Sequence, residues 1–177
     1  MKKEISLNQL RMLIDDTGNE LYKKKNILTR NSLKTIHKDA SGHEEVMSLE
    51  FDFEEGLEEV KRLNSDLIRY KTTLQKANLE TKISDEDTIA TALVKLDLNR
   101  KLISTLETLV SKEEVKHRRT DSSYSNYYYI EHIQLNFDKN SLIEYKEQLK
   151  AEINLLESQV DYANTNTKVT IDRKSVV

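Results

Sequence analysis

The 177-residue sequence contains no cysteine, no proline and no tryptophan, and it has three glycines. Without cysteine the chain cannot form a disulfide, a thiolate zinc site or a cysteine nucleophile, which fits a reducing compartment. Gly18, Gly42 and Gly56 lie too far apart to form a glycine-rich phosphate-binding loop. These absences exclude disulfide stabilisation and the phosphate-binding motifs that depend on clustered glycines.

Long apolar runs and an excess of one charge are also missing. No window approaches the roughly 18 consecutive apolar residues that a membrane-spanning helix requires. Behind the first lysines, Asn8, Gln9 and Arg11 interrupt any apolar stretch, so we expect no signal peptide and a cytoplasmic location. The chain has 28 Lys and Arg residues against 31 Asp and Glu residues, and this net charge of −3 gives no overall attraction to nucleic acid or to an anionic membrane.

Four stretches of the chain place apolar residues at the three- and four-residue spacing of an amphipathic helix. Ser6 and Gln9 have the spacing of a capping box at the start of the first stretch. With 33% charged and 37% apolar residues, the composition favours long helices that have one polar, solvent-exposed face. The spacing predicts helices over about residues 7–36, 50–78, 86–115 and 139–165.

These four helices are similar in length, which permits antiparallel packing side by side. We therefore predict an all-α fold, a single domain over residues 1–177 built as an antiparallel bundle of about four long helices. Polar residues at about 37–48 predict a flexible loop, and residues 168–177 form a C-terminal tail.

One segment, at about residues 127–137, breaks the helical pattern, because its apolar and polar residues alternate as in a strand. It lies between the third and fourth helices. A lone strand leaves its backbone groups unpaired, so this one requires a partner. Three partners are open: Val115 to Arg119 as a hairpin, the tail from Lys168 to Ile171, or the same segment of another subunit.

Several short motifs from Tyr70 to Asp172 resemble the septicolysin-like family of small bacterial helical proteins. The order and spacing of the motifs carry this resemblance, which covers somewhat over half of the chain. The biochemical role of the family is not established, and its name implies a pore-forming or haemolytic activity. The motifs are Asn78-Leu79-Glu80-Thr81, Thr88-Ile89-Ala90-Thr91-Ala92-Leu93 with Asp97, Tyr124-Ser125, and Asn164-Thr165-Asn166-Thr167.

The histidines give no pattern typical of an enzyme. His37, His43, His117 and His132 form no His-x-x-x-His pair, and Glu114 to His117 is the single Glu-x-x-His spacing, whereas a carboxylate metal site inside a helix bundle uses two such pairs. The cluster His43-Glu44-Glu45 is the nearest approach to a metal site, and solvated side chains explain it better. We therefore predict no catalytic residue, no metal, no cofactor and no enzymatic activity.

Self-association is the expected activity, because narrow apolar stripes bury little area in a single layer. Asn99 interrupts the apolar seam of the third helix together with Arg100, and two interpretations are open. It either sets the register against a neighbouring helix or lies at the edge of the stripe in water. The predicted homo-oligomer interface contains Asn99, Tyr127, Tyr129, Ile133, Leu135 and Phe137.

A basic and aromatic segment before and within the predicted strand supports a competing function, nucleic-acid binding. Cations would contact phosphates, and tyrosine rings would stack on bases. Glu113, Glu114 and Asp121 dilute this patch. We predict a non-enzymatic scaffold or adaptor with an unknown protein partner, ahead of nucleic-acid binding and, third, membrane activity. The predicted nucleic-acid patch contains Lys116, His117, Arg118, Arg119, Tyr124 and Tyr127, followed by Tyr128 and Tyr129.

Overall fold

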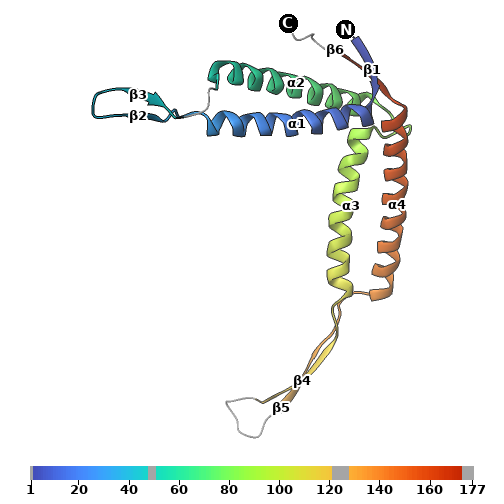
Figure 1. Cartoon of the computed structure of the whole chain (residues 1–177). Coiled ribbons are helices and arrows are strands. Elements are labelled where there is room, and N and C mark those ends of the chain that lie inside the picture. The colour runs from blue at the N-terminus through green and yellow to red at the C-terminus, as the bar shows by residue number, and fades with distance from the viewer. Residues whose placement is uncertain (1, 48–50, 121–127, 173–177) are drawn as a thin grey trace. The chain divides into compact units, whose positions relative to one another are not determined.

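The computed structural model describes residues 2–47, 51–120 and 128–172. Within these residues the fold is mostly helical, with four helices and three small antiparallel strand pairs (Figure 1). The helical class predicted from the sequence is confirmed. The elements in chain order are β1 (Lys2–Ser6), α1 (Leu7–Arg30), β2 (Ile36–Lys38), β3 (Glu44–Val46), α2 (Phe53–Glu80), α3 (Ile89–Val110), β4 (Val115–Thr120), β5 (Tyr128–Ile133), α4 (Lys139–Asn166) and β6 (Lys168–Asp172).

The chain divides into two compact units. The first contains Met1–Lys82 together with Tyr162–Val177, and the second contains Ile83–Asp161. The first unit therefore holds the pair α1 and α2 with β1 and β6, and the second holds α3, β4, β5 and most of α4.

The α1–α2 pair buries one stripe from each helix. Leu21 of α1 packs with Val60 and Leu63 of α2 in one cluster. An ion pair between Lys24 and Glu59, with Nζ and Oε2 2.7 Å apart, joins the two helices beside this cluster. Apolar packing therefore runs along the pair and continues into a second cluster next to the strands β1 and β6.

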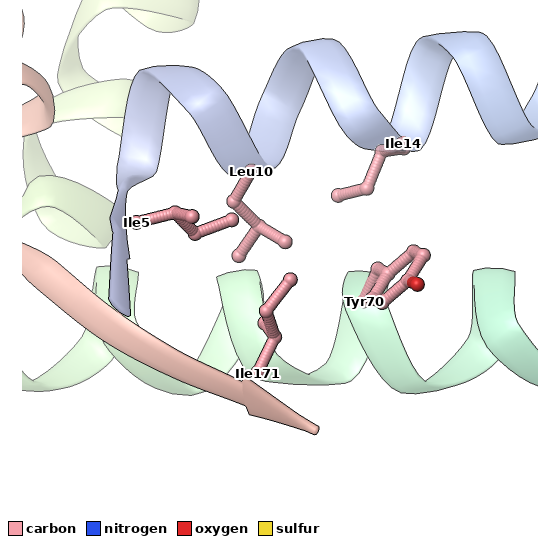
Figure 2. Packing of buried hydrophobic residues seen from close by; sticks show 5 residues of the cluster. All are labelled: Ile5, Leu10, Ile14, Tyr70 and Ile171. Atoms are coloured by element: carbon pink, nitrogen blue, oxygen red, sulfur yellow. The ribbon is translucent and has the colours of Figure 1, made fainter. Parts of the chain in front are cut away.

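The strands β1 and β6 complete this second cluster. They pair antiparallel, with Ile5 opposite Val169 and Lys3 opposite Ile171. Residues two apart in a strand face the same side, so Val169 and Ile171 lie on one face together with Ile5, and this face packs against the helices. Figure 2 shows both of them packed with Leu10, Ile14 and Tyr70. The tail from Lys168 to Ile171 therefore pairs with β1 and not with the strand after α3.

The first predicted helix is too long at its C-terminal end. It ends at Arg30, and part of the predicted loop at 37–48 forms the hairpin β2–β3. The Asp39 carboxylate organises the turn, because its Oδ1 accepts hydrogen bonds from Ser41 N at 2.8 Å and His43 N at 2.9 Å. Gly42 has φ +88°, a conformation that glycine adopts without steric cost. Local turn chemistry therefore replaces the helix continuation that the apolar spacing predicted.

The other predicted helices need smaller corrections. α2 begins three residues later than predicted, where the Asp52 side chain caps it by accepting from Glu55 N at 3.0 Å. α3 covers 89–110, shorter than the predicted 86–115, because Val115 pairs with Ile133 in the next hairpin. α4 ends at Asn166, one residue beyond the prediction.

In the second unit α3 and α4 lie side by side, and β4 and β5 extend beyond one end of the pair (Figure 1). The Arg100 guanidinium of α3 donates to the Glu157 carboxylate of α4. Near the hairpin, Glu114 Oε1 accepts from Leu135 N at 3.3 Å, and Lys112 O accepts from Lys139 Nζ at 3.4 Å. The β4–β5 hairpin therefore joins the end of α3 to the start of α4.

Candidate interaction surfaces

The predicted strand exists and pairs with Val115–Thr120 of the same chain, the first of the three partners considered. In this β4–β5 hairpin, Val115 lies opposite Ile133 and Arg118 opposite Ile130. Val115, Ile130 and Ile133 are all exposed. A two-stranded hairpin is at best marginally stable alone, and a third strand or a packed face normally supports it. The described part of this hairpin thus offers apolar side chains and strand edges to a partner.

The predicted interface residues do not all belong to this strand. β5 ends at Ile133, so Leu135 and Phe137 lie in the connection to α4, where both are half-buried. The strand was predicted to continue to residue 137, and this was wrong. The Leu135 amide donates a hydrogen bond to the Glu114 side chain and not to a neighbouring strand. Tyr129 belongs to β5, and Tyr127 is outside the described residues.

Asn99 lies on the inward side of α3. It is half-buried and is spaced three residues after the buried Leu96 and seven before the buried Leu106. That spacing places the three side chains on the same side of the helix. The next residue, Arg100, is exposed and pairs with Glu157 within the chain. The structure therefore places the predicted seam residue on the side of α3 that packs within the same chain.

The residues of the predicted nucleic-acid patch that lie on β4 do not all face the same side of the hairpin. Lys116 and His117 are exposed on β4, and consecutive strand residues face opposite sides. Lys116 lies opposite His132, and His117 lies opposite Glu131. Arg118 and Arg119 continue the same strand, and Tyr124 is outside the described residues together with Tyr127. Lys116 and His117 therefore do not share one face of the hairpin.

The hairpin β2–β3 is a second apolar surface, which was not predicted from the sequence. Ile36 lies directly opposite Val46, and both side chains are exposed. Met47 continues the pairing by donating its N–H to Thr35 O at 2.9 Å, and its side chain is also exposed. The turn signal from Asp39 to Gly42 between two β-branched residues could have revealed this hairpin.

Helix α3 also exposes apolar side chains opposite its buried ones. Val94 and Leu98 are 59% and 58% exposed, and Leu102 is 36% exposed. The buried residues of the same helix are Ile89, Ala92, Leu96 and Leu106. An amphipathic helix on a protein surface normally has polar residues opposite its buried stripe. The described α3 departs from that pattern.

The described carboxylates with shifted pKa values hold turns and helix starts. Lys95 donates to Asp87 with Nζ and Oδ2 2.6 Å apart, which lowers the pKa of Asp87 and raises the pKa of Lys95. A hydrogen bond from Ser141 Oγ to Asp138 Oδ2, at 2.6 Å, lowers the pKa of Asp138. Lys95 and Asp138 are exposed and Asp87 is half-buried, and all three groups have their partners in local structure.

A shallow depression of about 440 Å³ lies between α1 and α2. It is open to solvent and mixes apolar with charged walls, so it lacks the enclosed apolar shape of a typical ligand pocket. Over residues 2–47, 51–120 and 128–172, no group of three or more His, Asp or Glu side chains is placed to hold a metal ion. Across the same described ranges, no helix is long and apolar enough to cross a membrane. The depression is lined by Ile14, Asp15, Gly18, Asn19, Leu67 and Lys71.

Comparison with known proteins defines the fold alone. No protein-family model matches the chain, and no curated protein is similar to it. A crystal structure of a functionally unknown conserved protein from Corynebacterium diphtheriae matches with a TM-score of 0.64 at 15% sequence identity. The match covers 94% of this chain and 99% of that chain. The arrangement of helices and strands therefore recurs in a second protein of nearly the same extent.

Proposed function

We propose that the chain is a non-enzymatic, self-associating helical scaffold or adaptor. The observation that carries this proposal is the number of large apolar side chains that remain exposed on all four helices. A surface helix that buries one stripe and exposes further apolar residues gains free energy when another surface covers them. Examples are Met12 and Tyr22 of α1, Phe53 and Leu79 of α2, Val94 and Leu98 of α3, and Tyr145 and Tyr162 of α4.

The hairpin β4–β5 contains the part of the proposed interface that was predicted from the sequence. Its exposed Val115, Ile130 and Ile133 are accompanied by strand edges that can accept further hydrogen bonds. The non-enzymatic part rests on the histidines. None of the four histidines has a second histidine at the His-x-x-x-His spacing of a helical metal site.

Solution mass tests the proposal. Multi-angle light scattering over a micromolar concentration series should give a multiple of 20.7 kDa. Ile133→Lys should weaken the association by introducing a charge at the exposed edge of the hairpin. Ile68→Lys, at an exposed position of α2 outside the hairpin, is the matched control. A mass that stays at one chain across the series overturns the proposal.

Nucleic-acid binding is the competing proposal. The position of Glu131 opposite His117 weakens it, because a carboxylate beside the basic strand repels phosphates. A gel shift at low salt with single- and double-stranded DNA and RNA separates the two functions. Salt-sensitive binding that is lost in the double variant Arg118→Ala/Arg119→Ala would favour the competing proposal.

A further inference from the structure

Three of the exposed large apolar residues of α3, Val94, Leu98 and Leu102, lie in one stripe, and the fourth, Leu93, lies outside it. Leu98 follows the buried Leu96 by two residues, which places it about 200° further around the helix. The stripe is thus turned away from the inward side of α3. Its members are Thr91, Val94, Leu98, Leu102, Thr105 and Leu109, none of them charged; Leu109 is half-buried and the others are exposed.

The spacing keeps this stripe straight. Successive members are three, four, four, three and four residues apart, and the first three steps make an 11-residue repeat. An 11-residue repeat corresponds to about 3.67 residues per turn, close to the 3.6 of a straight α-helix. The stripe therefore stays on one side of α3 over about 27 Å, at 1.5 Å per residue. A second straight helix could follow it along its whole length.

The stripe is close to symmetrical about Arg100. Leu98 and Leu102 lie two residues on either side of that position, and Thr91 and Leu109 lie nine residues on either side. An antiparallel copy of α3, related by a two-fold axis at this level, would set Leu98 against Leu102 of the second copy. The pattern is therefore complementary to itself in the antiparallel direction.

The charges beside the stripe favour the same orientation. Asp97 and Lys101 lie along one flank, exposed, with Lys101 Nζ 2.6 Å from Asp97 Oδ2. A two-fold axis brings like flanks of two antiparallel helices together, so Asp97 would lie about 3 Å along the axis from Lys101 of the second copy. Along the helix axis, the two ammonium groups of the two copies would lie between the two carboxylates, so each carboxylate would have a lysine of the other copy as its neighbour. In a parallel pair, the flank with Asp97 and Lys101 would instead meet the opposite flank of the second copy, so these charges would not pair with each other.

We propose that the outward face of α3 binds the same face of a second copy of this chain in an antiparallel, two-fold arrangement, with Asp97 and Lys101 setting the orientation. This inference rests on the proposed self-association and adds a surface distinct from the β4–β5 hairpin. Uncharged residues in the stripe supply the attraction, and the flanking charges select the antiparallel partner.

The first test places a charge in the stripe. Leu98→Glu should weaken self-association at least about 100-fold, since the two-fold axis brings the substitution into the interface twice. Leu155→Glu, on α4, is the matched control because Leu155 is 59% exposed and Leu98 is 58% exposed. The control should change the dissociation constant by less than about 3-fold. Sedimentation equilibrium measures both, and circular dichroism checks that the helices are retained.

The second test measures orientation and keeps the stripe intact. Asp97→Lys gives a wholly positive flank, and Lys101→Asp gives a wholly negative one. Each variant alone should associate about 10-fold more weakly than the unaltered chain. A mixture of the two should form mostly hetero-dimers, which native mass spectrometry resolves from the homo-dimers. A statistical mixture of the three dimers overturns the antiparallel arrangement.

The outcomes separate this inference from the proposed function. A monomeric unaltered chain overturns both. Self-association that Leu98→Glu leaves unchanged overturns the α3 interface and leaves the scaffold proposal standing. Loss of association in Leu155→Glu to the same extent also overturns the α3 interface, because the two positions then act alike.

Discussion

The β1–β6 pair and the β4–β5 hairpin are both two-stranded and antiparallel, but they differ in what covers their apolar residues. Ile171 of β6 is 5% exposed and packs with Leu10 and Tyr70, whereas Ile130 of β5 is 58% exposed. The side chains are chemically identical. Apolar residues in a strand pair therefore indicate a structural role where helices cover them and an interaction role where no described residue does.

The strand pairs also differ in how far apart their strands lie in the sequence. The turn of β2–β3 joins its strands locally, with Asp39 and Gly42 holding the turn. β1 and β6 come from opposite ends of the described chain and are held by packing on α1 and α2. Short-range turn chemistry thus forms one pair, and tertiary packing forms the other.

The largest difference between the two strand pairs is expected when an isoleucine is truncated to alanine in each of them. Ile171→Ala should destabilise the first unit by about 2–4 kcal/mol, because it opens a cavity beside Leu10 and Tyr70. Ile130→Ala should cost less than about 0.5 kcal/mol in the monomer. Amide hydrogen exchange in α1 and α3 reports each unit separately. Equal costs at the two positions would contradict the distinction.

A smaller effect is expected at the junction between β1 and α1. Ser6 ends the strand and caps the helix, with its Oγ accepting from Gln9 N at 3.2 Å and its N–H donating to Gln9 Oε1 at 3.0 Å. Ser6→Ala should therefore cost about 1 kcal/mol in thermal unfolding. Ser158→Ala within α4, where the hydroxyl only bonds back to Asn154 O, is the control and should be close to neutral. The interpretation fails if both serines cost the same.

The smallest effect should be a local pH response of the β2–β3 hairpin. Hydrogen bonds from Ser41 and His43 lower the pKa of Asp39 below its ordinary value of about 3.9. Because the folded pKa is depressed, the stabilisation is present above that ordinary value and is lost as pH falls through the folded pKa. NMR titration of the Ser41 and His43 amides should show a midpoint below 3.9 that Asp39→Asn abolishes. A midpoint at or above that value would contradict the turn assignment.

Features that depend on nearby residues could be predicted from the sequence. The capping box of Ser6 and Gln9 is present, and α4 was located within one residue. The strand after α3 was predicted from its alternation, and its partner was among the alternatives considered. These elements are specified by spacing within one or two turns of chain.

Features that depend on distant partners could not be predicted. Lys2–Ser6 contains a single apolar residue, Ile5, and only the pairing with Lys168–Asp172 makes it a strand. Ile89, Leu96, Ile103 and Val110 recur every seven residues in the sequence, and they lie on the inward side of α3, where they are buried or half-buried. The outward stripe with Leu98 is equally visible in the sequence, but periodicity alone does not say which of two apolar faces is covered.

The pairing of β1 with β6 also has a consequence during protein synthesis. β1 leaves the ribosome roughly 160 residues before β6, which takes about 8–30 s at 5–20 residues per second. Throughout that interval Ile5 and Leu10 lack the cover that Ile171 later provides, whereas the residues of the second unit are complete sooner. The first unit can finish folding only after translation has passed the second, so nascent chains expose this apolar cluster to chaperones.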